Sequence, residues 1–196
     1  MNVPKRVGLY FGSFNPVHVG HLIIANHVAQ HHALDEVWLV VTPQNPLKNK
    51  ASLLPDYQRL QLIKLAIGDN PKLKASDIEF KLPQPNYTIT TLAHLTQKFP
   101  TINFSIILGQ DNLQSFNKWF QYEHILANYQ LIIYPRPNVA PSVFDTHPNV
   151  HWVTNAPHMA VSATAIRAAL KAKQSVAYLV PQAALNYINE MHFYEK

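Results

Sequence analysis

The stretch Gly8-Leu-Tyr-Phe-Gly-Ser-Phe-Asn-Pro-Val-His-Val-Gly-His21 decides how this chain folds. It begins as a buried apolar strand, breaks at Gly12, passes through a short polar turn and enters a helix near Gly20. The turn carries His18 and His21. A strand–turn–helix entry is a natural phosphate site, because the first N–H groups of a helix have no partners inside it and carry partial positive charge. Two imidazoles there can donate hydrogen bonds to phosphate oxygens, so the stretch indicates nucleotide phosphate chemistry without a P-loop lysine.

Length and composition narrow the class of protein. The 196 residues are 47% hydrophobic, which is enough for one α/β domain with a sizeable core. There is no cysteine, no leader-like N-terminal stretch and no apolar run near the ~20 residues of a membrane span, so we expect a cytoplasmic protein without a membrane partner. The net charge of +5 is scattered, which fits a nucleotide pocket better than a nucleic-acid footprint.

Apolar runs alternate with helix-period segments, a pattern typical of a parallel α/β sheet. Strands are expected at 7–11, 37–41, 73–75, 103–108, 131–134 and 150–153, with an extended segment at 78–81. Helices are expected at 22–30, 55–67, 88–98, 122–128, 162–173 and 181–190. The sequence therefore predicts a single domain over residues 1–196: a doubly wound, Rossmann-like parallel sheet with helices on both faces. Its ligands should bind beyond the carboxyl ends of the strands.

Two motifs in order along the chain resemble the nucleotidyltransferase superfamily with an H-x-G-H motif. Gly12-Ser-Phe-Asn-Pro-Val-His-Val-Gly-His21 resembles its (T/S)-x-F-x-P-x-H-x-G-H signature. Val161-Ser-Ala-Thr-Ala-Ile-Arg167 resembles its I-S-x-T-x-(I/V)-R motif, with valine at the first position. Ser162 is a plausible N-cap, and Arg167 follows within the first turns, where it can reach the same phosphates. We expect the helices at 162–190 to complete the nucleotide site.

Elements between these motifs resemble the bacterial nicotinate-mononucleotide adenylyltransferases. A Tyr87-Thr88 pair opens a predicted helix, where Thr88 can also serve as its cap. Gly109 permits close backbone approach to a ligand, and Asp111 can accept hydrogen bonds from ribose hydroxyls. Trp119 is either a stacking platform for a pyridine ring or a core tryptophan.

Two cations on proline-rich loops are further candidates. Lys48 follows the second strand in Pro43-Gln-Asn-Pro-Leu-Lys48, a partial match to the basic loop of the same family, and is otherwise a solvated lysine. Arg136 lies between two prolines after the fifth strand and can contact phosphate or carboxyl groups, or remain a surface arginine.

The resemblance implies transfer of AMP from ATP to nicotinate mononucleotide, or to nicotinamide mononucleotide, which the sequence does not distinguish. It implies catalytic roles for His18, His21, Lys48 and Arg167. It places at ATP the residues Gly12, Ser13, Phe14, His18, His21, Gly109, Asp111, Ser162 and Arg167. It places at the mononucleotide the residues Tyr87, Thr88, Trp119 and Arg136. No metal-ligand cluster is evident, so Mg²⁺ is expected to arrive with ATP.

Other interpretations remain at this point. A pantetheine-phosphate adenylyltransferase or a cytidylyltransferase would share the fold and the histidine motif. A class I aminoacyl-tRNA synthetase would need a K-M-S-K-S motif, which the sequence lacks. A non-catalytic nucleotide- or RNA-binding module would use the basic surface and show strong salt dependence. The oligomeric state is not indicated.

Overall fold

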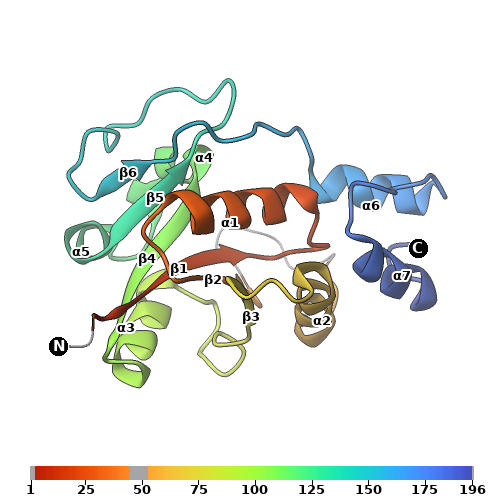
Figure 1. The fold of residues 1–196 in the computed structure, drawn as a ribbon, viewed down its shortest axis with the longest axis horizontal. Coiled ribbons are helices and arrows are strands. Elements are labelled where there is room, and N and C mark those ends of the chain that lie inside the picture. The colour runs from red at the N-terminus through yellow and green to blue at the C-terminus, as the bar shows by residue number, and fades with distance from the viewer. Residues whose placement is uncertain (1–2, 45–52, 196) are drawn as a thin grey trace.

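The computed structural model describes residues 3–44 and 53–195, and within them six strands form one all-parallel sheet (Figure 1). The strand order is β3-β2-β1-β4-β5-β6. The strands are β1 (Lys5–Gly12), β2 (Glu36–Val41), β3 (Leu73–Ser76), β4 (Ile102–Gly109), β5 (Gln130–Tyr134) and β6 (Val150–Trp152). The helices are α1 (Val19–His31), α2 (Asp56–Ile67), α3 (Thr88–Lys98), α4 (Gln110–Gln114), the 3₁₀ turn η1 (Phe116–Lys118), α5 (Tyr122–Asn128), α6 (Ala163–Lys171) and α7 (Gln182–Glu190).

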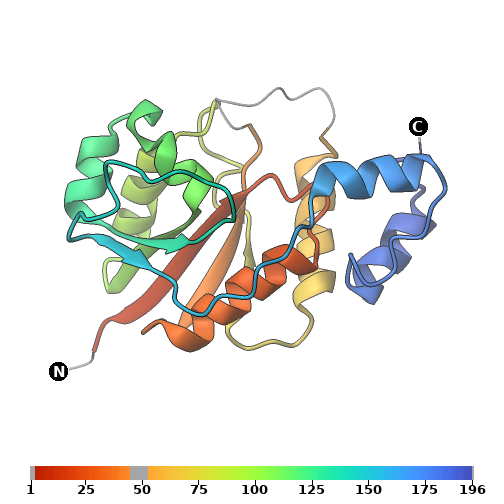
Figure 2. The same cartoon turned by 90° about the horizontal axis from the view of Figure 1, so that it is seen from above.

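The helices cover both faces of the sheet because alternate strand residues point to opposite sides. On one face, Tyr10 of β1 packs with buried residues of α1 and α2, such as Val28 and Leu62. On the other face, Leu9 packs with buried residues of α3 and α5, such as Leu92. Both views of the ribbon place α6 and α7 at the end of the molecule opposite the N-terminus (Figures 1 and 2). The doubly wound architecture expected from the sequence is confirmed.

One predicted element is wrong, and two short ones were missed. The segment 78–81 is a turn instead of an extended chain: the Phe80 N–H donates to the Asp77 carbonyl at 2.9 Å. The strand ends at Ser76, whose hydroxyl accepts the Ile78 N–H, so the alternating apolar residues after it do not continue the ladder. The helices α4 and η1 span five and three residues, too few to show a helical period in sequence.

The topology positions the site. β1 and β4 are neighbours, but the chain leaves β1 for α1 on one face and leaves β4 for α4 and α5 on the other. This reversal opens a crevice beyond the carboxyl ends of the two strands, where Gly12 and Gly109 lie, and such crevices bind ligands in open α/β sheets. In the described part of the chain, no helix is long and apolar enough to cross a membrane.

Candidate active site

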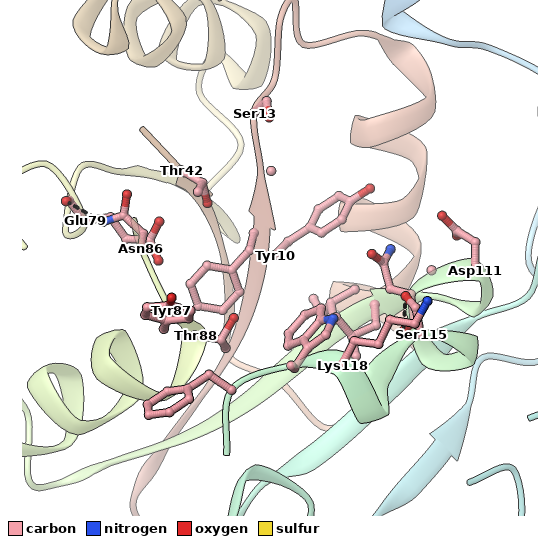
Figure 3. A pocket seen from close by; sticks show the side chains of 18 residues that line it. Tyr10, Ser13, Thr42, Glu79, Asn86, Tyr87, Thr88, Asp111, Ser115 and Lys118 are labelled. Atoms are coloured by element: carbon pink, nitrogen blue, oxygen red, sulfur yellow. Dashed lines mark hydrogen bonds between the residues drawn. The ribbon is translucent and has the colours of Figure 1, made fainter. Parts of the chain in front are cut away.

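Two adjoining cavities occupy the crevice in the part of the chain that the structure describes. The first has a volume of about 700 Å³ and carries most of the aromatic side chains (Figure 3). The second has a volume of about 490 Å³ and carries His21, Arg136 and Arg167. Their common wall consists of Tyr10, Phe11, Gly12, Ser13, Gly109, Asp111 and Asn112. A ligand that fills both cavities therefore passes over the end of β1.

The two motif histidines form a stacked pair at the start of α1. Their ring centroids are 3.7 Å apart with an interplanar angle of 24°. His18 is the N-cap residue, and its backbone N–H donates to Nδ1 of His21 at 3.3 Å. Because Nδ1 of neutral His21 is an acceptor in this contact, its proton lies on Nε2. The wall of the second cavity therefore carries an imidazole N–H donor suited to an anionic oxygen.

His18 is held in its neutral form. Its side chain is buried, and this burial, together with the positive charge of Arg136, lowers the pKa of the imidazole from 6.5 to about 4. Its Nδ1 atom is buried and has no hydrogen-bond partner among the described residues. At neutral pH, His18 therefore adds hydrogen-bonding capacity and packing to the site without adding charge.

Glycines and Phe14 give the histidine pair its shape. A Cβ atom on Gly20 would lie 3.1 Å from Nδ1 of His18, so the imidazole rests directly over the Gly20 backbone. Phe14 has a left-handed backbone (φ 46°), and a Cβ atom on Gly12 would lie 2.8 Å from its ring. The Phe14 side chain is 2% exposed and packs edge-on against His21 at 5.0 Å. Phe14 thus orients His21 from within the core and offers little surface to a ligand.

The first turn of α1 differs from the sequence-based expectation of outward, unpaired N–H groups. The Val19 N–H donates to the Leu179 carbonyl at 2.9 Å, and the His21 N–H donates to the His18 carbonyl at 2.9 Å. Leu179 belongs to the segment between α6 and α7. Its carbonyl therefore takes up the Val19 N–H, one of the backbone donors that the sequence analysis expected to bind phosphate. At the start of α1, the donor that faces the second cavity is therefore the His21 side chain more than the backbone N–H groups.

Arg167 of the late motif lines the second cavity together with His21 of the early motif. It extends from α6, and its Nη1 donates to the Asn15 carbonyl at 2.7 Å. Its Nη2 makes a longer contact, 3.4 Å, to the Thr164 hydroxyl. Ser162 is the N-cap of α6 and accepts the Ala165 N–H at 3.2 Å, as expected, but its residue is not part of either cavity wall.

A fully buried arginine that sequence reasoning missed lies beneath the turn. Arg59 of α2 is 0% exposed, and its Nη1 donates to the carbonyls of Ser13 at 2.5 Å and Thr42 at 3.1 Å. Its Nε donates to the Leu54 carbonyl at 3.0 Å, and its Nη2 pairs with Asp56 at 2.6 Å. Burial lowers the pKa of the guanidinium, and Asp56 opposes that shift. One side chain thus joins the end of β1, the end of β2 and the start of α2.

Aromatic side chains line the first cavity. Trp119 packs against Phe116 with ring centroids 5.3 Å apart, and Phe116 is fully buried behind it. Tyr87, the N-cap residue of α3, packs against Phe120 at 5.1 Å. Thr88 lies beside Tyr87 in the same wall (Figure 3). The resemblance placed Tyr87, Thr88 and Trp119 at the mononucleotide, and the structure brings these three residues to one cavity.

A buried carboxyl braces the wall that carries Tyr87. Glu79 is 1% exposed, and its Oε1 accepts the Thr91 hydroxyl at 2.7 Å. Burial raises the pKa of Glu79, and hydrogen bonds from Thr91 and Thr42 lower it. The Asn86 side chain donates to the Glu79 carbonyl at 3.2 Å and accepts the Gln44 N–H at 3.2 Å. The segment that enters α3 is thereby fixed to the end of β2.

Asp111 and Arg136 lie together at the rim. Arg136 Nε is 2.9 Å from Asp111 Oδ1, and the two side chains are 42% and 52% exposed. A Cβ atom on Gly109 would lie 2.5 Å from Asp111 Oδ1, so the glycine makes room for this pair. Arg136 lines the second cavity with His21, whereas the sequence placed it at the mononucleotide. An exposed pair of this kind contributes little to stability, so both groups are available to a ligand at small cost.

The chain is similar to known proteins over nearly its whole length. A family model described as cytidylyltransferase-like matches residues 9–169, from β1 into α6. The chain belongs to that family. It is 54% identical, over 97% of this chain and 100% of the relative, to the probable nicotinate-nucleotide adenylyltransferase of Flavobacterium psychrophilum. It is 44% identical to the protein of the same description from Bacteroides fragilis, over 93% of this chain and 90% of the relative.

Solved structures share the fold. The Plasmodium falciparum nicotinic acid mononucleotide adenylyltransferase complexed with NaAD superposes with a TM-score of 0.81 at 18% identity, over 97% of this chain and 98% of that chain. A putative nicotinate-nucleotide adenylyltransferase from Vibrio parahaemolyticus superposes with a TM-score of 0.73 at 18% identity, over 98% of this chain and 96% of that chain. The cytidylyltransferase-like sheet and its C-terminal helices therefore recur at low sequence identity.

The predicted site residues of this cytidylyltransferase-like chain fall into three groups. Most lie on the two cavities, as described above. Ser162 and His18 lie behind the cavity walls. Lys48 lies outside the described residues.

Sequence reasoning missed several polar groups of the site. Arg59 occupies the buried stripe of α2, three and four residues before Leu62 and Ile63, so the helical period could have placed it in the core. Lys118, a cation on the wall of the first cavity, follows no motif. Tyr194, whose hydroxyl donates to Asn15, had no signal in the sequence.

Proposed function

We propose that this chain transfers AMP from ATP to nicotinate mononucleotide, releasing pyrophosphate and forming deamido-NAD, a step of NAD biosynthesis. One observation carries the proposal: an aromatic cavity and a cavity with His21 and Arg167 share a wall at the end of β1. A pyridine ring in the first cavity and ATP in the second bring the phosphate of the mononucleotide to the α-phosphate of ATP. The curated relatives, described as probable nicotinate-nucleotide adenylyltransferases, support the same reaction.

The reaction we propose is an in-line displacement at the α-phosphorus of ATP. A phosphate oxygen of the mononucleotide forms the new P–O bond, the bond to the bridging α–β oxygen breaks, and the electron pair leaves with pyrophosphate. The nucleophile is already anionic, so neither a general base nor a covalent intermediate is needed. The protein contributes alignment of the two phosphates and stabilisation of the charge that shifts to the leaving group.

Each residue of the second cavity has a distinct part in this proposal. His21 donates from Nε2 to a phosphate oxygen of ATP, with the ring held by His18 and Phe14. Arg167 places a guanidinium beside the same phosphates. We propose that Lys48, which lies outside the described residues, offsets charge on the leaving pyrophosphate.

In the first cavity, we propose that Trp119 stacks on the pyridine ring. The backbone at Tyr87 and Thr88 then faces the ring substituent, because α3 begins there and its first N–H groups have no partners within the helix. Such donors suit a carboxylate. Nicotinate mononucleotide is therefore our preferred acceptor over the amide.

Mg²⁺ enters this proposal as part of the substrate Mg·ATP. Among the described residues, no group of three His, Cys, Asp or Glu side chains is placed to hold a metal ion. Mg²⁺ in phosphoryl and nucleotidyl transfer is bound largely by substrate phosphates and water. We also propose that the chain acts as one domain, completed at the nucleotide by α6 and α7, in the cytoplasm where both substrates occur.

The test is release of pyrophosphate from Mg·ATP with three acceptors assayed separately: nicotinate mononucleotide, nicotinamide mononucleotide and phosphopantetheine. We expect release with nicotinate mononucleotide and a slower rate with the amide. Release with phosphopantetheine alone would keep the fold and the displacement but overturn the aromatic site. No release with any of the three, together with salt-sensitive binding of RNA, would overturn the proposal in favour of a non-catalytic module.

A further inference from the structure

Asn15 is the point where three distant segments meet the histidine turn. It is 3% exposed and lies between Phe14 and Pro16. Its Oδ1 accepts both the Leu54 N–H at 3.1 Å and the Tyr194 hydroxyl at 2.8 Å. Its backbone carbonyl accepts Nη1 of Arg167 at 2.7 Å. Asn15 therefore accepts hydrogen bonds from three segments: the residues just before α2, the arginine of α6 and the segment after α7.

Tyr194 donates its hydrogen bond to Asn15 while its own backbone is in an unfavourable left-handed conformation. Its φ is 68°, and His192, two residues earlier, has a φ of 53°. Left-handed conformations are unfavourable for residues other than glycine, and they persist where surrounding contacts fix them. Two contacts do so here: Phe193 is buried and packs edge-on against Tyr187 of α7 at 5.6 Å, and the Tyr194 hydroxyl reaches Asn15.

The surroundings of the hydroxyl keep it a donor. Tyr194 is partly buried, and burial raises the pKa of its phenol, whereas the positive charges of Arg167 and Arg59 lower it. A protonated phenol donates one hydrogen bond, and Asn15 Oδ1 receives it. A different segment, the one between α6 and α7, supplies the Leu179 carbonyl that accepts the Val19 N–H at the start of α1. Residues of α6, α7 and their flanks thus touch the turn from Asn15 to Val19 at both ends.

We propose that Tyr194 is a positioning residue for adenylyl transfer: through Asn15 it holds Arg167 and the turn that carries His18 and His21 in register with the ATP phosphates. The inference rests on the proposed function and adds to it a residue that touches neither substrate. Asn15 and Arg167 line the second cavity and not the first. Loss of the Tyr194 hydroxyl should therefore affect ATP and leave the pyridine site unchanged.

The experiment compares Y194F with Y187F. Both variants remove one tyrosine hydroxyl from the same region. Tyr187 packs against Phe193, whereas Tyr194 donates to Asn15, so Y187F is the matched control. For Y194F we expect kcat/KM for Mg·ATP to fall about three- to tenfold, which is the effect of one lost hydrogen bond. We expect KM for nicotinate mononucleotide to stay within about twofold of wild type, and Y187F to match wild type for both substrates.

A double-mutant cycle with N15A tests the route. If Tyr194 acts through the Asn15 side chain, Y194F should add no further loss in the N15A background. Should N15A fail to fold, the affinity of Y194F for Mg·ATP, measured by calorimetry without an acceptor, provides the second measurement. A three- to tenfold weaker affinity, or the same factor in kcat with unchanged affinity, supports positioning of the phosphates.

Two outcomes would overturn the inference. In the first, Y194F unfolds at a lower temperature while its kcat/KM for Mg·ATP, assayed well below that temperature, equals that of Y187F. In the second, Y194F raises KM for the mononucleotide as much as KM for ATP. Failure of the proposed function itself gives a different result, namely wild-type protein that releases no pyrophosphate with any acceptor. The calorimetric comparison of Y194F, Y187F and wild type on Mg·ATP then still decides whether Tyr194 supports the nucleotide cavity.

Discussion

Replacing Gly20 by alanine should lower the activity of this enzyme and leave its folding stability nearly unchanged. The new Cβ would lie 3.1 Å from Nδ1 and 3.2 Å from Cε1 of His18. His18 has little room to yield, because its ring is stacked on His21 at 3.7 Å and is 6% exposed. We therefore expect G20A to shift both rings by a few tenths of an ångström, or to rotate His18 out of the stack.

The expected magnitudes differ for folding and for turnover. Alanine is favoured over glycine in a helix by up to about 1 kcal/mol, and the close contact with His18 offsets a similar amount, so unfolding free energy should change by less than about 1 kcal/mol. Displacement of a group that aligns reacting phosphates by about 1 Å costs about a hundredfold in rate. A shift of a few tenths of an ångström at His21 should then lower kcat about tenfold.

The assay pairs pyrophosphate release with thermal unfolding, and Gly68 provides the matched control. Gly68 ends α2 with a φ of 56°, and a Cβ atom there would meet nothing within 4 Å. G68A should cost about 1–3 kcal/mol through backbone strain, lower the melting temperature by several degrees and leave kcat unchanged. A G20A protein with wild-type kcat, or with activity lost only in proportion to stability, would refute our account of the histidine pair.

Three further substitutions test other parts of the site. H21A should lower kcat at least about a hundredfold with a melting temperature close to wild type, since it removes the donor to phosphate; near-normal pyrophosphate release would contradict this role. R59M should leave the carbonyls of Ser13, Thr42 and Leu54 without this donor and cost about 3–5 kcal/mol, measured by urea unfolding; a loss under about 1 kcal/mol would show that water replaces the guanidinium. W119A should raise KM for nicotinate mononucleotide about tenfold and leave KM for ATP unchanged, and equal increases in both would argue against stacking.

The sheet and its order of elements were predictable because the strands are apolar runs separated by helices with clear periodicity. The helices α3 and α5 have the predicted bounds, since each begins and ends at a recognisable change of pattern. At 78–81, Ile78 and Phe80 alternate with polar residues, a pattern that also occurs in strands, although the segment is a turn. In the structure, Glu79 points inward to Thr91 instead, a contact that depends on α3 and is not written in the local pattern.

The site residues that belong to a sequence motif were predictable. The residues that reach the site only through packing of distant segments were not. The motif places His18 and His21 in one turn, but their stacking and the neutral state of His18 depend on how the folded chain packs around them. Arg59 and Tyr194 act on the turn through backbone and amide oxygens, which every sequence provides in abundance. Their partners are fixed only when the sheet and the C-terminal helices are assembled.

In the function we propose, the histidine turn contributes hydrogen-bond donors to the phosphates more than it contributes positive charge. His18 has a pKa of about 4 and is neutral at physiological pH. The N–H groups of Val19 and His21 in the first turn of α1 donate to carbonyls of the protein itself. In the function we propose, positive charge for the phosphates then comes from side chains outside the turn, such as Arg167, and from the metal that we expect to accompany ATP. Because Arg167 is itself held on Asn15, the placement of charge and the placement of the imidazole donors depend on the same residue. From that shared anchor we expect a change in the late motif to disturb the early one, although the two are distant in sequence.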